Sequence, residues 1–439
     1  MKTRGFAAFL AAVLLLLSLT ACNPLDSAID DLITPPQQSG NGYPIQQALK
    51  TAAGGDITLK YPVTGEYRSA FSFVDIDADG FDEAIATYSS TVDGTVSMHL
   101  NVIDYENEKW VSKSDAKIVG NGVEKLVFRD LDGDSRPEII VGWMIYGTVN
   151  KQVGVYSYTD KGLAQRILEN YTDFLCDTIE KESNAKELIV LNLDTTAKTS
   201  VIKVLTLGKD GVTERGSALL DGGVTSYSAP VISTLKGGQP AIYIDAVKGA
   251  GSLTEIVWFD GGTLKSTYDS TLGETAVTYR PTVVNSGDIN GDKIPDVPIM
   301  NLLLSTADKS DADKVYVTAW SNFDGKKLAS VKNTLMNYTD GYYLTVKKEW
   351  QSSLYLARKL DTGLRTFYSY DEKLGVAGSE VFRIITVAED DISSGKFDDT
   401  GYETLGSSSG RLYLTKIVPE NELGVTFDEL KENFFIIGG

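Results

Sequence analysis

The sequence predicts an all-β fold built from a repeated unit, and three observations carry this prediction. An acidic loop with oxygen-bearing side chains at alternate positions occurs three times, beginning at Asp75, Asp130 and Asp288. Each copy runs into a short apolar segment of the kind that forms buried strands. Further copies that lack the acids continue the same spacing along the chain. Because self-similarity at a fixed period indicates a repeat architecture, these loops define the fold.

The three acidic loops carry the ligands that a hard divalent cation prefers. Ca²⁺ takes about six to eight oxygen ligands, and a folded-back loop turns alternate side chains inward. Positions one, three, five and nine would offer side-chain oxygens, and position seven its backbone carbonyl. The predicted ligands of about three Ca²⁺ ions are Asp75, Asp77, Asp79, Phe81 and Glu83; Asp130, Asp132, Asp134, Arg136 and Glu138; and Asp288, Asn290, Asp292, Ile294 and Asp296.

These loops differ from an EF-hand loop, which needs an acid at position twelve and a helix after it. Position twelve is Ala86, Val141 or Ile299, and strand-like segments follow the loops. A lone Asp-x-Asp-x-Asp is more often a solvated turn. Three copies between apolar strands favour calcium loops that lie in hairpins.

Degenerate copies of the loop set the length of the repeat. They begin at Asp177, Ser233 and Lys396, and together with the acidic loops they give steps of 55, 47, 56, 55 and 108 residues. The last step equals two steps of 54, which places another copy near residue 342. Units of this length approach the ~40–50-residue, four-stranded blades of β-propellers. We therefore expect a seven-bladed β-propeller over residues 56–420, with calcium loops in the blade hairpins.

The pattern Asp-x-Asp-x-Asp-Gly-x-x-Asp before a short apolar strand resembles the FG-GAP and VCBS repeats of integrin α-like propellers. The resemblance implies calcium in the hairpin between the first two strands of a blade, with a structural role, in a surface-exposed adhesion or ligand-binding protein. The chain departs from the pattern in having Ser135 and Lys293 at position six, where these repeats prefer Gly. If position six requires a positive φ, Lys293 would be strained by about 1 kcal/mol.

The copy near the C-terminus has Lys396 in place of the acid at position one. We expect the Lys396 ammonium group to take the place of the metal ion and to pair with Asp398.

The N-terminus resembles a bacterial lipoprotein signal. Lys2 and Arg4 precede an apolar run of twelve residues, which is too short to span a membrane. The signal segment then ends in Leu-Thr-Ala-Cys22. In proteins that this segment resembles, the chain is cut before Cys22, which then carries the lipid; an ordinary secretory peptide is the alternative. We expect a signal peptide over 1–21, the lipidated cysteine and a tether over 22–55, and attachment to the outer face of a bacterial membrane.

The composition agrees with an extracytoplasmic protein that avoids polyanions. The chain has 60 acidic and 41 basic residues, a formal net charge of −19. A surface this acidic repels nucleic acid, so we expect no nucleic-acid partner. If Cys22 is lipidated, Cys176 is the only free thiol, so an internal disulfide is excluded. We expect the Cys176 side chain to act as a small buried hydrophobic residue rather than as a nucleophile.

The single histidine, His99, limits the enzymatic alternatives. Strand alternation places it opposite Met98 and Leu100, so we expect an exposed side chain without a catalytic role. Ser-His-Asp catalysis and multi-histidine zinc sites are therefore disfavoured.

Both ends of the predicted propeller have a structural assignment. Residues 421–439 contain a capping-box pattern that begins at Thr426, which predicts one short C-terminal helix. The segment from Asp56 to Pro62 is expected to pair with Arg411–Ile417 and so to close the ring. Aromatic residues such as Trp143 and Trp350 are more consistent with packing between blades than with a binding surface.

The favoured function is a lipid-anchored, calcium-binding propeller that acts as a non-catalytic binding or adhesion module for a protein or glycan. The alternative is an extracellular carbohydrate-active enzyme, either a polysaccharide lyase or a glycoside hydrolase, because such enzymes need no histidine.

Overall fold

The computed structural model describes residues 42–92, 95–118, 120–145, 151–179, 186–311, 313–359 and 362–437. The predicted signal peptide, Cys22 and the first part of the tether lie outside the described residues. Within them, the chain forms two compact units, Met1–Arg129 with Ser135–Leu168, and Asp130–Asp134 with Glu169–Gly439. No helix of the described residues is long and apolar enough to cross a membrane.

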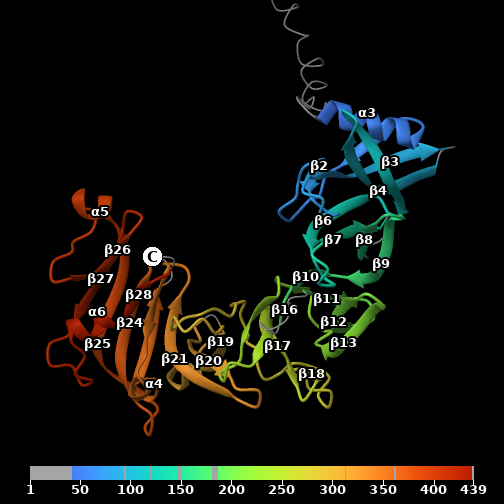
Figure 1. The fold of residues 1–439 in the computed structure, drawn as a ribbon. Helices are drawn as coiled ribbons and strands as arrows, with labels where there is room; N and C mark the ends of the chain where they lie inside the picture. Colours follow the sequence, from blue (N-terminus) through green and yellow to red (C-terminus); the bar gives the residue numbers. More distant parts are fainter. Residues whose placement is uncertain are drawn as a thin grey trace, which may run out of the picture. The chain divides into compact units, whose positions relative to one another are not determined.

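The all-β prediction is confirmed, because the described strands form six antiparallel sheets of four or five strands each (Figure 1). The first two sheets follow one another along the chain, with strand orders β1-β3-β4-β5, to which β2 adds beside β3, and β6-β7-β8-β9. Their strands are β1 (Ile57–Lys60), β2 (Phe71–Val74), β3 (Glu83–Val92), β4 (Thr95–Glu106), β5 (Lys109–Ile118), β6 (Gly122–Arg129), β7 (Glu138–Met144), β8 (Lys151–Thr159) and β9 (Gly162–Tyr171).

The third and fourth sheets belong mainly to β10–β13 and β14–β18. Their strands are β10 (Asp173–Asp177), β11 (Glu187–Asp194), β12 (Thr199–Gly208), β13 (Gly211–Leu220), β14 (Ser226–Tyr227), β15 (Val231–Thr234), β16 (Pro240–Lys248), β17 (Gly251–Asp260) and β18 (Thr263–Ser266).

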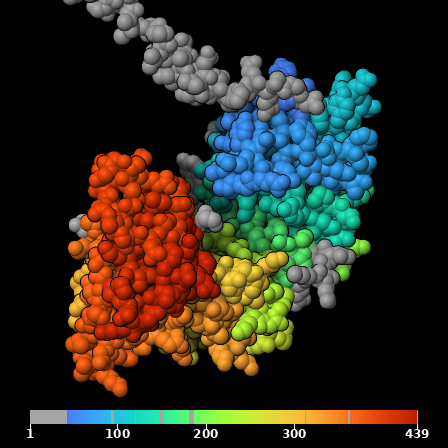
Figure 2. Space-filling view, turned by 90° about the vertical axis from the view of Figure 1, so that its left-hand side faces the viewer, coloured from blue at the N-terminus to red at the C-terminus, as the bar shows by residue number. Residues whose placement is uncertain are grey.

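The last two sheets have the orders β19-β20-β21-β22-β28 and β23-β24-β25-β27-β26. In Figure 2 the red C-terminal part of the chain forms one continuous surface. The strands are β19 (Val297–Leu302), β20 (Tyr316–Phe323), β21 (Leu328–Asn337), β22 (Tyr342–Thr345), β23 (Leu354–Lys359), β24 (Leu364–Asp371), β25 (Val376–Ala388), β26 (Glu403–Ser408), β27 (Arg411–Ile417) and β28 (Phe434–Ile436).

Consecutive sheets bury apolar side chains in common clusters within each unit. One cluster joins Leu100 of β4 to Val141 of β7, and another joins Tyr243 of β16 to Val297 of β19. The strands that follow the first two acidic loops are buried on both faces: residues 83–90 of β3 are buried, and in β7 every residue from Glu138 to Trp143 is buried. These two apolar runs are therefore buried strands, as the sequence predicts. In β19, after the third loop, only Val297 and Pro298 are buried.

The number of sheets differs from the predicted number of blades: the described residues form six sheets, whereas the spacing predicts seven units. The difference arises in the interval of 108 residues between Asp288 and Lys396, which the spacing divides into two repeats. Strand β22, from the copy expected near residue 342, completes the fifth sheet. The Lys396 loop lies between β25 and β26 of the sixth sheet, and the long strand β25 pairs with both β24 and β27.

The ends of the chain also pair differently from the prediction. Strand β1, within the segment from Asp56 to Pro62, pairs with β3 rather than with Arg411–Ile417. This register places Leu59 beside Tyr88 in the apolar core of the first sheet, which gives β1 a local partner. At the other end, β28 pairs with β22.

Short helices complete the two units. Helix α3 (Gly42–Ala53) occupies part of the predicted tether and buries Ile45 and Leu49 against the first sheet. The predicted C-terminal helix is present as α6 (Phe427–Glu432), where Thr426 accepts a hydrogen bond from the backbone N–H of Glu429. The others are η1 (Leu304–Thr306), α4 (Lys348–Ser353) and α5 (Glu389–Ser393).

Candidate metal centres and a basic pocket

Two of the three acidic loops join the strands of a hairpin, as the sequence predicts, whereas the third is closed by a single β-bridge. The first loop joins β2 to β3, the second joins β6 to β7, and the third immediately precedes β19. In each loop the residue at position nine pairs with the residue just before position one, which closes the loop at its base. These pairs are Val74↔Glu83, Arg129↔Glu138 and Gly287↔Asp296.

Carboxylates converge in two of the three loops. One carboxylate oxygen from each of Asp75, Asp77 and Glu83 lies within 4.8 Å of the others. The same holds for the group at positions one, three and nine of the second loop. That group is Asp130, Asp132 and Glu138. Three carboxylate oxygens at this separation could hold a metal ion, and such a hard donor set suits Ca²⁺.

The acid at position nine is buried although its neighbours are also acidic. Glu83 is 1% exposed, and its Oε2 atom accepts a hydrogen bond of 2.9 Å from the backbone N–H of Ile76. Burial, with a smaller contribution from the charges of Asp77 and Asp104, raises the pKa of Glu83 to about 7, although the hydrogen bond from Ile76 acts in the opposite direction. A bound cation would favour the charged form of this cluster, because it offsets both desolvation and repulsion.

The backbone of the three loops turns in the same way at two positions. At position six φ is +94° for Gly80, +72° for Ser135 and +67° for Lys293. The prediction of a positive φ at this position is therefore confirmed, and the residues with side chains there adopt the left-handed conformation. At position four the corresponding residues are Ala78, Gly133 and Gly291, with φ of +61°, +79° and +83°.

The first acid of each loop stabilises this backbone path. Asp75 accepts from the N–H groups of Asp79 and Gly80 at 3.2 and 3.0 Å. Asp79 in turn accepts from the N–H of Phe81 at 2.8 Å, and Asp79 does not belong to the converging group. The carboxylates of the loop thus have two roles. Some oxygens accept hydrogen bonds that stabilise the turn, and others converge as possible metal ligands.

The third loop differs from the other two in the partners of its acids. The Asp296 carboxylate accepts from the N–H of Ile289 at 3.0 Å and from the side-chain amide of Asn322 at 2.6 Å. Asn290 donates its amide to Asp292 at 3.0 Å instead of offering an anionic oxygen. Among the described residues, the acids of this loop form no converging group of three. The structure therefore supports two of the three predicted cages.

The copy that begins at Asp177 shows how the fold replaces a metal ion. Glu187, which occupies the closing position, accepts from the N–H of Ile179 at 3.1 Å, as Glu83 does from Ile76. The guanidinium group of Arg215 forms an ion pair with the other oxygen of Glu187. Lys186 pairs with Asp177 at 3.0 Å. Two basic side chains thus neutralise acids that correspond to the metal-type positions.

The hypothesis that Lys396 replaces the metal in the last copy is wrong. Lys396 is largely exposed and pairs with Asp391 of α5 at 3.3 Å, not with Asp398. Asp398 accepts from the backbone N–H and hydroxyl of Thr400 instead. This loop follows helix α5 rather than a strand, and its position nine is Thr404 instead of an acid.

His99 lies in a polar network rather than on an exposed strand face. Its side chain is 12% exposed and stacks on the ring of Tyr88, with centroids 4.6 Å apart. The ring nitrogens lie 2.9 Å from the hydroxyl of Ser90 and 2.6 Å from the carboxylate of Asp115. The prediction of exposure is wrong, because the register of β3, β4 and β5 places three polar side chains on one face.

A second polar network lies in the fourth sheet and its following loop. Glu255 is fully buried, accepts from the N–H of Asp221 at 2.7 Å, and receives the Thr275 hydroxyl at 2.9 and 3.0 Å. Burial raises the pKa of Glu255 to about 7. Burial by itself would raise the pKa of Asp221 as well. Hydrogen bonds from Lys248 and from backbone N–H groups outweigh this effect and lower the pKa of Asp221 below its usual value.

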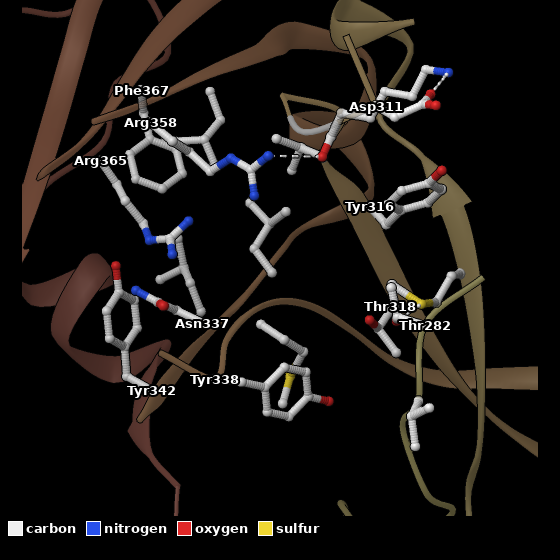
Figure 3. A pocket seen from close by; sticks show the side chains of 18 residues that line it. Thr282, Asp311, Tyr316, Thr318, Asn337, Tyr338, Tyr342, Arg358, Arg365 and Phe367 are labelled. Carbon is white, nitrogen blue, oxygen red and sulfur yellow. Dashed lines mark hydrogen bonds and ion pairs between the residues drawn. The ribbon is translucent and has the colours of Figure 1, made fainter. Parts of the chain in front are cut away.

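A basic pocket opens between the fifth and sixth sheets of the second unit, with a cavity volume of about 320 Å³. Arg358 and Arg365 extend from one wall, and Tyr316 and Thr318 form the opposite wall (Figure 3). This pocket was not predicted from the sequence. The signal that could have found it is the hairpin β23–β24, whose register brings its two arginines together.

The chain matches no family model and no curated protein. Solved structures show only distant similarity. An exotype rhamnogalacturonan lyase is 12% identical, with a TM-score of 0.27 over 74% of this chain and 66% of the lyase. A second rhamnogalacturonan lyase is 12% identical, with a TM-score of 0.30 over 75% of this chain and 59% of that lyase.

A periplasmic gluconolactonase of Pseudomonas aeruginosa is 10% identical, with a TM-score of 0.25 over 73% of this chain and 87% of that protein. The chain therefore spans less than two thirds of the length of the two lyases. Similarities this weak establish neither a common activity nor a common ligand.

Proposed function

We propose that this protein is a calcium-stabilised, non-catalytic binding module of the propeller type, held on the outer face of a bacterial membrane by a lipid on Cys22. The observation that carries the proposal is the convergence of Asp75, Asp77 and Glu83 in a hairpin loop, repeated in the loop that begins at Asp130. Shared apolar clusters between consecutive sheets support the propeller architecture.

Calcium fits these two loops better than a transition metal does. The donors are carboxylate oxygens without histidine or cysteine, and soft metals prefer nitrogen or sulfur ligands. Outside the cell, weak sites with dissociation constants of ~10⁻⁴–10⁻³ M suffice. The ions would have a structural role, because each loop lies at the start of a buried inner strand such as β7.

The chemistry of the pocket supports binding rather than catalysis. A glycoside hydrolase needs two carboxyl groups on opposite sides of the substrate. The acid that lines this pocket, Asp311, forms an ion pair of 2.7 Å with Lys314. A tyrosine base would need a lowered pKa, whereas burial raises the pKa of Tyr342 to about 12. The alternative of a carbohydrate-active enzyme therefore lacks a catalytic pair here.

Calorimetric titration of the purified full-length chain in mild detergent, after chelator treatment, tests the calcium sites. We expect two ions per chain and a higher melting temperature with calcium. At a concentration 100 times the dissociation constant, each ion would stabilise the fold by about 2.7 kcal/mol. Absence of both binding heat and a melting shift would refute the proposal.

Matched variants assign the two ions to their loops. Asp77→Asn and Asp132→Asn should each remove one ion from the stoichiometry. Asp288→Asn is the control, because its loop has no converging group. If the control also removes an ion, the third loop is a metal site and the assignment to two loops is wrong.

The membrane anchor has an independent test. Cells supplied with radioactive palmitate should label the wild-type protein and not the Cys22→Ala variant, and protease added to intact cells or spheroplasts should reach the wild-type chain. Equal labelling of the two proteins would exclude a lipid on Cys22.

A further inference from the structure

The pocket between the fifth and sixth sheets is built around two arginines that face each other. Arg358 of β23 and Arg365 of β24 are direct cross-strand partners, so their side chains lie on the same face of the sheet. Like charges directly opposite in an antiparallel pair destabilise a sheet. Burial, and after it the charge of Arg365, lowers the pKa of Arg358.

The charge of Asp313 acts on Arg358 in the direction opposite to the charge of Arg365. Arg358 donates a hydrogen bond of 3.1 Å to the backbone carbonyl of Lys314, a neutral acceptor. Among the residues that line the pocket, three are basic and one, Asp311, is acidic, which leaves a net charge of +2. Asp311 is itself paired with Lys314. This is a basic pocket in a chain with a formal net charge of −19.

Among the described residues, two buried polar atoms on the wall of the pocket have no hydrogen-bond partner. They are Nε of Arg365 and the hydroxyl of Tyr342, a residue that is only 2% exposed. Figure 3 shows the Tyr342 hydroxyl directed towards Arg365. An unsatisfied buried donor costs about 1–3 kcal/mol. An anionic acceptor bound in the pocket would satisfy these two donors and offset the positive charges of the two arginines.

The rest of the pocket fits a ring with hydroxyl groups. Tyr316 and the half-exposed Tyr338 offer aromatic faces, and Thr282 and Thr318 offer hydroxyls across from the arginines (Figure 3). Phe367 lies beside the two arginines and offers an apolar surface (Figure 3). The volume of about 320 Å³ lies at the lower end of the range for ligand pockets, which suits one or two rings rather than a longer chain.

We propose that this pocket binds a carboxylate-bearing sugar ring, with the carboxylate between Arg358 and Arg365 and the ring against Tyr316 and Tyr338. Planar guanidinium groups recognise carboxylates with paired hydrogen bonds, and the orphaned Arg365 Nε would gain an acceptor. Tyr342 would donate its hydroxyl to the same carboxylate. This assignment specifies a ligand class for the proposed binding module, but it uses no residue of the calcium loops.

Binding is measured on the full-length chain by calorimetry and by thermal shift with sodium D-galacturonate and sodium D-glucuronate. D-galactose and D-glucose are the matched neutral sugars, and inorganic phosphate and sulfate are the other anion probes. We expect binding of at least one uronate, with at least tenfold weaker binding of the neutral sugar of the same configuration. A response to phosphate or sulfate alone, or equal binding of neutral and acidic sugars, overturns the proposal.

The variants Arg365→Gln and Arg358→Gln locate the ligand. Loss of a charged hydrogen bond should weaken uronate binding by about tenfold to a hundredfold. Arg411→Gln is the matched control, because Arg411 is an exposed arginine of β27 in the same sheet. Uronate binding that is unchanged in both pocket variants overturns the assignment of the site.

Melting temperatures without ligand distinguish a binding role from a structural one. Arg365→Gln removes the repulsion across β23 and β24 and should therefore raise the melting temperature while uronate binding falls. Asp77→Asn in the first calcium loop should leave uronate binding unchanged at saturating calcium. Loss of calcium binding with uronate binding intact would refute only the proposed metal sites, and the reverse result would refute only this pocket.

Discussion

The imidazole of His99 lies 2.6 Å from the carboxylate of Asp115, and its other nitrogen lies 2.9 Å from the hydroxyl of Ser90. The three residues contact one another in the order of a Ser-His-Asp triad. Their burial is the opposite of that in a triad, because the serine is buried and the acid is exposed. Ser90 is 7% exposed, whereas the Asp115 side chain is 32% exposed. In a triad the serine must reach substrate while the acid is buried behind the histidine. The network therefore holds β3, β4 and β5 together.

The structural role of this network predicts that Asp115→Asn destabilises the protein. The Asp115 carboxylate accepts hydrogen bonds from Tyr88 and Asn101 as well as its contact with His99. An amide group replaces one acceptor by a donor, which should lower the free energy of unfolding by about 1–3 kcal/mol. Urea unfolding measures this change.

The exposed Asp210, in the turn between β12 and β13, provides the control Asp210→Asn, which should leave stability within about 0.5 kcal/mol of the wild type. Ser90→Ala should not affect hydrolysis of p-nitrophenyl acetate by the protein. Serine-dependent turnover of this ester would contradict the structural interpretation.

Local features were predictable from the sequence because they depend on neighbouring residues. The spacing of Asp75, Asp77 and Glu83 fixes a tight turn, and the apolar run after it fixes an inner strand. The positive φ at Lys293 follows from the same turn geometry. These predictions involve fewer than a dozen residues, so tertiary packing has little scope to change them.

Long-range pairing was not predictable in the same way. Strand β1 could pair with any unpaired edge, and the choice of β3 depends on the fit of Leu59 beside Tyr88. The described residues form six sheets rather than the seven predicted units, because β25 pairs with strands on both sides and joins two predicted units into one sheet. The environment of His99 depends on the register of two hairpins, which strand alternation alone does not specify.

The ion pair between Arg215 and Glu187 predicts a large effect of Arg215→Met. The Glu187 side chain is 5% exposed, so the substitution would leave a buried carboxylate without its cation. Removal of one partner from a buried pair costs about 3–5 kcal/mol, and a partly exposed arginine should give the lower value. Chemical denaturation measures the loss.

The double variant Arg215→Met with Glu187→Gln should recover most of that stability, because no uncompensated charge remains. Calcium stoichiometry should be unchanged in both variants. A double variant that is less stable than Arg215→Met alone would show that the charge of Glu187 is not the cause.

The left-handed conformation of Lys293 predicts that Lys293→Gly stabilises the third loop. Lys293 has φ of +67°, a region that costs a residue with a side chain about 1–2 kcal/mol relative to glycine. Part of this gain is offset by the greater flexibility of glycine in the unfolded chain, so the expected increase is about 0.5–1 kcal/mol. Thermal unfolding in chelator measures it without a contribution from calcium.

Lys327→Gly is the comparison, because Lys327 has no positive φ and should show no gain. If both substitutions raise the melting temperature equally, the effect comes from the loss of a lysine side chain and not from relief of backbone strain.

The buried carboxyl group of Glu255 predicts a fall in stability between pH 5 and pH 8. Burial raises its folded-state pKa to about 7 from an ordinary value of 4.5. Between these values the folded protein retains a proton that the unfolded chain releases, so unfolding becomes more favourable as the pH rises. The contribution is fully present below pH 4.5 and is lost above pH 7, with a size on the order of 3 kcal/mol.

Glu255→Gln separates this contribution from the rest of the network. The amide can still accept from the N–H of Asp221 and can donate to the Thr275 hydroxyl, so the hydrogen bonds remain while the titration disappears. Asp221 acts in the opposite direction, because its lowered pKa contributes stability that is lost only as the pH falls through the acid range. We therefore expect Glu255→Gln to be more stable than the wild type at pH 8 and similar to it at pH 5, measured by urea unfolding at both values. If the difference is equal at the two pH values, Glu255 does not titrate in the folded protein between them, which would contradict this prediction.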